Sequence, residues 1–407
     1  MKFIHFADAH LDSPFRGLSF LPSKEFNQIY QAADQSLTRI VDLALAEKVD
    51  LVLIAGDTFD SAKPSPRSQL FFAQQIKRLT DAQIQVVMIF GNHDHMRRED
   101  LLVNQSPYFK LLGAKNEAVE KATFKTKDNF NYDVVGFSYL NNHITEDKIP
   151  DFPGKEHNYT FGLMHAQEKE ADSRKNVYAP FTVSEVQALN YDYFALGHIH
   201  ARRNLSEKPW IVYSGNIQGR HINEMGTKGC YLGVIDENTK KTSIEFKTTG
   251  PILWQGVQVE LDTQISKADL QNEIIASLNN AKQKTYFSLT TAGAQFMTDE
   301  EQELVQDTDF WQNISQNLPF DSQLVDVRLK ISSNLELNEN DQQAFEQAKA
   351  EIFENDEFDK IVSDWKKKDP IAAQLTEDPA FIKAVKQLTE VKLMGKLKGI
   401  TDETETN

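Results

Sequence analysis

The sequence predicts an α/β protein of stacked sheets and flanking helices, followed by a small α+β unit and a helical region. Short apolar runs recur through the first 235 residues, each too short for a helix and typical of a buried strand. Amphipathic helical stretches separate the first of these runs, as in layered α/β domains. Several runs end in loops of polar residues, many of them beginning with glycine, as strands do at the edge of a sheet.

Each element of the first 250 residues follows from its local pattern. Strand-like runs and helical stretches alternate in the order β-α-β-α-β over residues 3–6, 26–48, 49–55, 70–79 and 86–90. In the first helical stretch, Ala33, Leu37 and Ile40 recur at helical spacing and form one apolar face. Shorter strand-like runs predominate later, at residues 133–137, 159–164, 193–196, 210–213 and 229–235. Two sheets flanked by helices fit this pattern.

Two boundaries are predicted in the rest of the chain. Gly250-Pro251 marks the first, so we expect a large domain over residues 1–250 and a small domain over 251–335. Residues 336–407 are predicted to form a separate helical extension.

The patterns within these later segments differ. Apolar and polar residues alternate over 257–261 and 325–331 with helical patterns between them, which predicts a small α+β domain. The extension carries apolar stripes at helical spacing, which we interpret as a surface that binds a partner. The alternative is that these stripes pack back on the small domain of the same chain. Residues 401–407 are expected to be a disordered tail.

Charge and cysteine content narrow the function classes. The 407 residues include 44 Lys and Arg against 60 Asp and Glu, a net charge of −16 that disfavours extensive phosphate binding. Most of this excess lies in residues 299–359, which hold 17 acidic and three basic residues. The single cysteine, Cys230, excludes a disulfide within the chain. Without a signal peptide or an apolar run of about 18 residues, we expect a cytoplasmic protein that does not bind membranes.

Polar residues with metal-ligand chemistry follow five of the predicted strands. In chain order these are Asp8 and His10, Asp57 and Asp60, Asn92 with His93 and Asp94, His165, and His198 with His200. Carboxylates, amide oxygens and imidazoles bind divalent cations, and an imidazole can also protonate a leaving group. In open α/β sheets, ligands bind at the carboxyl ends of strands. The repeated pattern therefore predicts one metal-dependent catalytic site.

The order of these motifs resembles the calcineurin-like metallophosphoesterases: Asp-x-His, Gly-Asp-x-x-Asp, Gly-Asn-His-Asp, His and Gly-His-x-His. Residues 7–15 and 213–221 further resemble the SbcD-type nuclease subunits, especially their YhaO-type relatives. The motifs cover about residues 1–235. The resemblance implies a four-layer α/β/β/α metallophosphoesterase sandwich, with the small domain as a DNA-capping domain and the helical C-terminal extension beyond it.

The resemblance also implies a role for each residue. Two divalent ions, with Mn²⁺ as the expected metal, would be bound by Asp8, His10 and His200 at one position and by Asn92, His165 and His198 at the other, with Asp57 bridging both. A carboxylate suits the bridge because it can offer an oxygen to each cation. The catalytic residues would be His93, which protonates the leaving alkoxide, and Asp60, which orients the His93 imidazole and keeps it protonated.

Several residues near the motifs keep more than one interpretation. Asp60 can instead cap a turn, and Asp94 is either a partner of the ligands or a loop former. The other histidines are expected in the core or on the surface: His5, His95, His143, His157 and His221. Substrate-binding residues are not predicted, because a basic pair such as Arg97-Arg98 is equally typical of a solvated surface.

We therefore expect a two-metal DNA phosphodiesterase, an exo- or endonuclease subunit that processes double-strand breaks or hairpins with an SbcC-like coiled-coil ATPase. The sequence has no Gly-x-x-x-x-Gly-Lys-[Ser/Thr] loop, so ATP use would come from that partner. The acidic stretch 299–359 argues against DNA contact by that face. A phosphoesterase for small nucleotides or phosphoproteins remains an alternative, as does a scaffold subunit that serves assembly. Whether the chain forms a homodimer is left open.

Overall fold

A computed structural model describes residues 1–15, 17–331, 339–353, 357–368, 375–376 and 378–397. Contacts divide the chain into a large unit, Met1–Leu253, and a small unit, Trp254–Asn407. The boundary predicted at 335/336 and the tail predicted over 401–407 lie outside the described residues. Among the residues described, every helix is too short or too polar to cross a bilayer.

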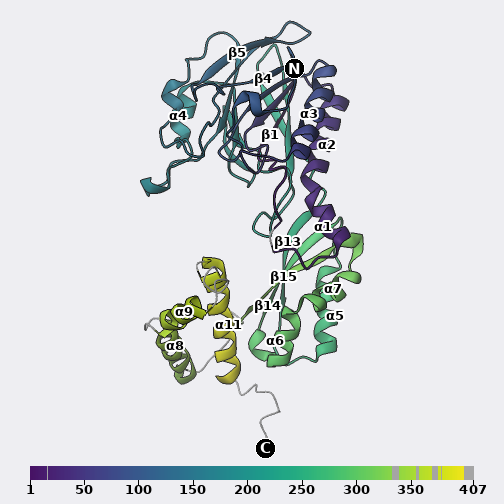
Figure 1. Ribbon diagram of the computed structural model, residues 1–407, viewed down its shortest axis with the longest axis vertical. Helices are drawn as coiled ribbons and strands as arrows, with labels where there is room; N and C mark the ends of the chain where they lie inside the picture. Colours follow the sequence, from purple (N-terminus) through teal and green to yellow (C-terminus); the bar gives the residue numbers. More distant parts are fainter. Residues whose placement is uncertain (16, 332–338, 354–356, 369–374, 377, 398–407) are drawn as a thin grey trace, which may run out of the picture. The chain divides into compact units, whose positions relative to one another are not determined.

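The large unit contains two six-stranded sheets (Figure 1). The first has the spatial order β12 (Thr242–Thr248), β11 (Gly229–Ile235), β1 (Lys2–Phe6), β2 (Leu51–Ala55), β3 (Gln85–Ile89) and β4 (Phe109–Leu111). The second has the order β5 (Glu120–Lys125), β6 (Asn131–Gly136), β7 (Tyr159–His165), β8 (Tyr193–Gly197), β10 (Trp210–Tyr213) and β9 (Arg203–Glu207). Strands β1 to β4 are parallel, as are β6, β7, β8 and β10. Their carboxyl ends therefore share one edge in each sheet.

Helices cover the outer faces of the two sheets. They are α2 (Ala32–Glu47), α3 (Pro66–Asp81) and α4 (Val183–Ala188). Helix α1 (Ser23–Tyr30) precedes α2 and contacts it, and short 3₁₀ turns form at η1 (Arg98–Asp100), η2 (Ile149–Asp151) and η3 (Ser173–Lys175). Apolar residues of α2 and α3 form one core with the first sheet, and Val186 of α4 belongs to the core of the second. A third core lies between the sheets, where the Phe3 ring is 5.1 Å from Phe161 and 4.8 Å from Tyr193. The predicted α/β/β/α sandwich is confirmed.

Some helices begin or end at other residues than predicted, for local chemical reasons. The helix predicted over 26–48 is two helices, because the chain turns at Gln31 between α1 and α2. Helix α3 begins earlier than predicted, with Pro66 in its first turn and the Ser65 hydroxyl accepting from the N–H of Ser68.

The small unit is built on a three-stranded sheet. Its strands, in spatial order, are β13 (Leu253–Glu260), β14 (Thr285–Ala292) and β15 (Gln323–Lys330). Between them lie α5 (Lys267–Leu278), η4 (Ala294–Phe296), α6 (Asp299–Gln306), α7 (Thr308–Gln316) and η5 (Pro319–Asp321). Helices α6 and α7 are separate, because Asp307 leaves the helical conformation and its carboxylate caps α7 at the N–H of Asp309.

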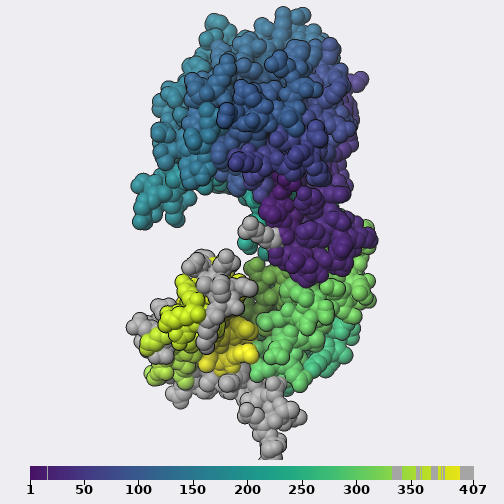
Figure 2. Space-filling model, viewed as in Figure 1, coloured from purple at the N-terminus to yellow at the C-terminus, as the bar shows by residue number. Residues whose placement is uncertain are grey.

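Among the described residues, three more helices follow in the small unit: α8 (Glu339–Phe353), α9 (Glu357–Lys368) and α11 (Pro379–Leu397). Val391 of α11 is fully buried in the core of this unit, and Leu388 packs against the same core. Lys392 also pairs with Asp299 of α6 at 3.5 Å. Figure 2 shows the yellow atoms of α11 against the green atoms of the sheet region. Because an amphipathic helix must bury its apolar face, α11 covers its own domain. This packing favours the alternative interpretation for that helix, and partner binding by residues 336–407 stays a prediction.

Candidate metal centre

The carboxyl ends of five strands bring together all seven residues predicted to bind metal. Asp8 and His10 follow β1, Asp57 follows β2, Asn92 follows β3, His165 ends β7, and His198 and His200 follow β8. His198 and His200 are partly exposed, whereas the other five are buried. Both sheets of the sandwich therefore contribute to one site.

Four of these residues adopt a left-handed backbone conformation that a Cβ atom disfavours. Their φ angles are 52° at Asp8, 44° at His10, 50° at Asp57 and 98° at His198. Such conformations cost about 1–3 kcal/mol each and persist where surrounding contacts impose them. Here the N–H of Asp8 donates to the Gly56 carbonyl at 3.1 Å, and the N–H of His10 donates to the Asp57 carbonyl at 3.0 Å. The loops are thus held in strained positions that aim the side chains inward.

Two glycines allow these loops to approach one another. A Cβ atom on Gly91 would lie 2.2 Å from Oδ1 of Asp57. A Cβ atom on Gly56, whose φ is 86°, would lie 2.6 Å from Nδ1 of His165. Both positions therefore require glycine beside a predicted ligand.

The side chains of Asn92, His165 and His198 converge. Nε2 of His165 lies 3.0 Å from Oδ1 of Asn92, and Nδ1 of His198 lies 3.2 Å from the same oxygen. Nδ1 of His165 donates to the main-chain carbonyl of Ala55 at 2.9 Å. This bond fixes the tautomer and turns the Nε2 lone pair toward the site.

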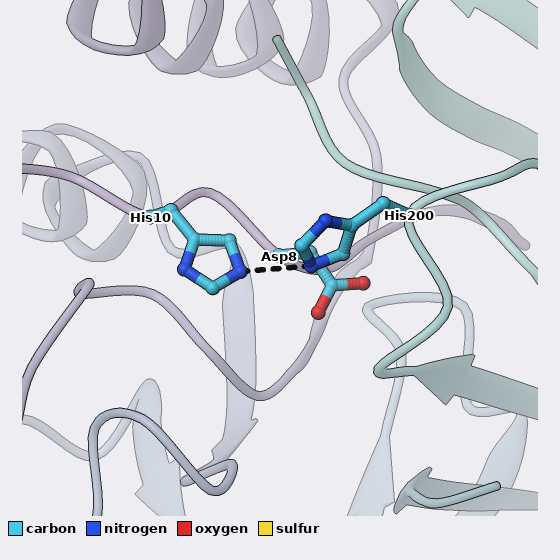
Figure 3. Close-up of side chains that lie close together, drawn as sticks. All are labelled: Asp8, His10 and His200. Atoms are coloured by element: carbon cyan, nitrogen blue, oxygen red, sulfur yellow. Dashed lines mark hydrogen bonds between the residues drawn. The ribbon is translucent and has the colours of Figure 1, made fainter. Parts of the chain in front are cut away.

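His10 and His200 face each other beside Asp8 (Figure 3). Their Nε2 atoms are 3.0 Å apart. Nδ1 of His10 lies 3.1 Å from Oδ1 of Asp60. Nδ1 of His200 lies 2.6 Å from Oε1 of Glu224. Each carboxylate accepts an Nδ1–H, which leaves the Nε2 lone pair for a cation.

Asp57 lies between the two groups of ligands. Its Oδ2 is 3.3 Å from Nε2 of His165 and 3.7 Å from Nε2 of His10. Its Oδ1 accepts the main-chain N–H of His93 at 2.8 Å. One carboxylate oxygen therefore faces a histidine from each group, as a bridging ligand must.

The spacing of the donor atoms fits divalent cations. With octahedral bonds of about 2.1 Å, neighbouring ligand atoms lie about 3.0 Å apart. The facing pairs of donor atoms are 3.0, 3.0 and 3.2 Å apart. Lone pairs at these distances repel unless a cation or a proton lies between them, and a mixed nitrogen and oxygen donor set suits ions such as Mn²⁺. The seven residues present therefore fit a pair of divalent ions.

Asp60 contacts His93 through its main chain rather than its carboxylate. Its carbonyl accepts from Nδ1 of His93 at 3.1 Å. Its Oδ1 instead accepts from Nδ1 of His10, from Ser13 Oγ at 2.9 Å and from Arg220 Nη1 at 2.7 Å. The predicted role of the Asp60 carboxylate is thereby corrected, since it orients a predicted metal ligand. The His93 side chain is exposed, so its Nε2 is free to meet a substrate.

Asp94 joins the loops that carry Asp57 and Asn92. Its buried carboxylate accepts the N–H of Thr58 at 2.7 Å and that of Gly91 at 2.7 Å. It is therefore a partner of the ligand loops. Of the other histidines, His5 is buried, His95 is half-buried, and His143, His157 and His221 are exposed.

The loop between β10 and β11 adds two residues to which the sequence motifs assign no role. Glu224 contacts His200, and its Oε2 accepts from Asn216 Nδ2 at 2.8 Å and from the N–H of Arg220 at 2.7 Å. Arg220 lies within the stretch 213–221 that carried the family resemblance, so a signal was present there. Glu224 lies outside that stretch, and its partner is distant in sequence.

Burial and neighbouring charges shift the pKa values of the site. Burial opposes protonation of His165, but the carboxylates of Asp57 and Asp8 outweigh it and raise the pKa of His165 to about 9. Burial, reinforced by His165, lowers the pKa of His198 to about 3. Burial favours the neutral acid at Asp57, yet the imidazoles of His165 and His10 lower its pKa below the usual range. The carboxylates thus attract positive charge into a site where five of the seven predicted ligands are buried.

Comparisons with known proteins agree with this geometry. Residues 1–202 match the calcineurin-like phosphoesterase family, a stretch that includes every predicted metal ligand, His93 and Asp60. The uncharacterized metallophosphoesterase YhaO of Bacillus subtilis is 36% identical over 263 residues, which are 64% of this chain and 63% of YhaO. A relative from Staphylococcus epidermidis, the SbcD polypeptide of the nuclease SbcCD, is 22% identical over 331 residues, covering 75% of this chain and 83% of SbcD.

Another relative is the DNA double-strand break repair protein Mre11 of Methanocaldococcus jannaschii. It is 27% identical over 246 residues, covering 57% of this chain and 62% of Mre11. The chain thus spans a little under two thirds of YhaO and of this Mre11. Among solved structures, a dimetal phosphatase from Danio rerio covers 61% of this chain and 96% of its own, at a TM-score of 0.38 and 12% identity, too remote to bear on function.

The family match lies where the structure gathers its ligand-type side chains. Residues 1–202 contribute strands β1 to β8 and all five strand ends that meet at the site. Residues 1–202 therefore form a calcineurin-like metallophosphoesterase domain.

Proposed function

We propose that this chain is a two-metal-dependent DNA phosphodiesterase, an exo- or endonuclease subunit that processes double-strand breaks or hairpins. The observation that carries this proposal is the convergence of seven ligand-type side chains, with facing imidazole nitrogens 3.0 Å apart and an exposed His93 beside them. The names of two relatives, a nuclease subunit and a DNA double-strand break repair protein, favour DNA among phosphoester substrates.

The residues of the chain divide between the two ions. We propose Mn²⁺ at both positions, because imidazole, amide and carboxylate donors occur together there. When bound, two such ions lower the pKa of water and neutralise charge on phosphoryl oxygens. One ion would be held by Asp8, His10 and His200, the other by Asn92, His165 and His198, and both by Asp57.

His93 is proposed as the general acid. Its ring contacts His10 edge to face, with centroids 5.0 Å apart. Its Nδ1 donates to the Asp60 carbonyl, so Nε2 is the atom that carries a proton to the leaving alkoxide. Its main-chain N–H is bonded to Asp57, which ties the position of the acid to that of the bridging carboxylate.

The proposal also assigns a role to the small unit and predicts a partner protein. The small unit would serve as the DNA-capping domain, and an SbcC-like coiled-coil ATPase would be the partner. Helix α6 has acidic side chains throughout its first turn, so we propose that DNA meets other faces of this unit. We place the activity in the cytoplasm, the location that the sequence favours.

A nuclease assay with Mn²⁺ tests the proposal. Single-stranded, blunt duplex and hairpin DNA are incubated with the full chain, with and without a candidate coiled-coil ATPase, and product lengths are measured. We expect metal-dependent cleavage of at least one DNA that chelation abolishes. A cyclic nucleotide and a phosphopeptide are tested in parallel. Hydrolysis of either without cleavage of DNA would replace the nuclease with a phosphoesterase for that class. Inertness toward all substrates would favour a scaffold.

A further inference from the structure

One guanidinium lies between the two carboxylates that contact His10 and His200. Nη1 of Arg220 donates to Oδ1 of Asp60 at 2.7 Å. Nη2 of Arg220 lies 3.4 Å from Oε1 of Glu224. Two hydrogen-bonded chains therefore start at Arg220 and end at the facing Nε2 atoms of the histidines.

Each chain fixes an imidazole in the state that binds a cation. Asp60 and Glu224 accept the Nδ1–H of their histidines, and this contact sets both the tautomer and the ring orientation. The two carboxylates carry like charges and repel each other, and both contact the Arg220 guanidinium. A cation between Asp60 and Glu224 holds them in place against that repulsion.

The two groups of ligands are supported differently. In the Asn92 group, the His165 ring is fixed by the main-chain carbonyl of Ala55, and the His198 ring packs on Tyr178 with centroids 4.4 Å apart. Loss of Arg220 would therefore disturb the support of one group and leave that of the other in place.

We propose that Arg220 is a positioning residue that sets the metal affinity of the Asp8, His10 and His200 site alone. This inference rests on the proposed two-metal centre. Loss of an outer partner of a metal ligand typically weakens metal binding about 10–100-fold. Because Arg220 supports only one of the two sites, its loss should weaken metal binding at that site relative to the other, even though both sites share Asp57.

The loop that carries Arg220 has anchors that do not need its side chain. The main-chain N–H of Arg220 donates to Oε2 of Glu224, and Asn216 Nδ2 donates to the same oxygen. Lys228 Nζ donates to the carbonyl of His200 at 2.9 Å. A change of the Arg220 side chain therefore removes the guanidinium contacts and leaves these anchors.

Calorimetric titration of the metal-free full chain with Mn²⁺ tests the inference. The variants are Arg220→Met, which keeps much of the side-chain volume, and Arg220→Lys, which keeps the charge but not the two-sided contact. The matched control is Arg78→Met, because Arg78 also pairs with a carboxylate, that of Asp42, but contacts no predicted ligand. We expect two sites in the wild type, with one of them about 10–100-fold weaker in Arg220→Met. Arg220→Lys should recover part of this loss.

The outcomes separate this inference from the proposed function. If the wild type takes up no Mn²⁺, the two-metal centre itself is wrong. If the wild type binds two ions and both Arg220 variants also bind two ions with unchanged affinities, the centre stands and the role of Arg220 is refuted. Equal weakening of both sites also refutes it, because a general structural role would act on both. A second readout is the double variant Arg220→Met with Glu224→Gln, which should lose little more affinity than either single variant.

Discussion

Nδ1 of His5 lies 2.9 Å from the hydroxyl oxygen of Tyr193, so a histidine of β1 is bonded to a tyrosine of β8 in the opposite sheet. Nε2 of the same ring lies 3.3 Å from the carbonyl of Leu196, to which it can donate. The His5 ring is fully buried between the sheets. Burial outweighs the carbonyl contact and lowers the pKa of His5 to about 3. A neutral imidazole thus links the two halves of the sandwich.

Acid should destabilise the large unit through His5. The pKa of His5 in the folded chain is below the ordinary value of 6.5. As the pH falls below 6.5, His5 therefore becomes protonated in the unfolded chain but stays neutral in the folded chain. The free energy of unfolding should therefore fall by about 2 kcal/mol between pH 7.5 and pH 5 from this group. Urea unfolding at both pH values, with His5→Gln and the exposed control His157→Gln, measures it. An equal pH dependence in wild type and His5→Gln would contradict the prediction.

Asp57→Asn should weaken both metal sites. The amide keeps the shape of the side chain but removes the charge that faces His10 and His165. Loss of a residue that only contacts a metal ligand typically lowers metal affinity about 10–100-fold. Loss of the bridging charge should therefore lower the affinity for each Mn²⁺ by at least about 10-fold. Calorimetry gives both affinities, and Asp133→Asn is the matched buried control outside the site. If only one of the two sites weakens, Asp57 is not a bridge.

His93→Ala should abolish turnover while both ions stay bound. General acid catalysis typically contributes about 10²–10⁴-fold, and the alanine cannot protonate the leaving group. A p-nitrophenyl phosphodiester needs no such protonation, so the variant should recover part of its rate on that substrate. Metal content by mass spectrometry is measured alongside, with exposed His157→Ala as the control. Loss of metal together with activity would make His93 a ligand.

Asp94→Ala should destabilise the large unit. It leaves the buried N–H groups of Thr58 and Gly91 without their acceptor, and each unsatisfied group costs about 1–3 kcal/mol. We expect a loss of about 2–5 kcal/mol in the free energy of unfolding by urea. Asp81→Ala, which removes an exposed carboxylate paired with Lys77, should change it by less than about 1 kcal/mol. Similar values for the two variants would show that Asp94 does not secure the loops.

Val391→Ala should lower the thermal stability of the small unit. Val391 is fully buried in that core, so its truncation should cost about 1–3 kcal/mol. Ile361→Ala is the control, because Ile361 is 46% exposed. Calorimetric melting of the full chain measures both. If Val391→Ala leaves the melting temperature unchanged but abolishes binding to a coiled-coil ATPase, α11 is a docking helix instead.

The sequence predicts the parts of the site that depend on local pattern. Asp8, Asp57 and Asn92 each follow a short apolar strand, and parallel strands bring such residues to one edge. The four-layer sandwich follows for the same reason, because strand and helix periodicities are local.

Contacts between distant segments were not accessible in this way. The Asp60 carboxylate finds His10 across 50 residues, although His93 was the expected partner. The left-handed backbone of Asp8 and His198 is imposed by neighbouring loops, since neither residue type favours it strongly enough to signal it. The burial of α11 likewise depends on which apolar surface its apolar stripe packs against, and helical periodicity alone does not predict that surface.

The position of β1 has a consequence for synthesis on the ribosome. This first strand pairs with β2 on one side and with β11, Gly229–Ile235, on the other. His198 donates its main-chain N–H to Asp8 from 190 residues further along the chain. A nascent chain that contains only the predicted ligands of the first sheet therefore lacks the imidazoles contributed by the second sheet. Metal loading of the proposed centre would then be a late event in biogenesis, after translation has passed β11.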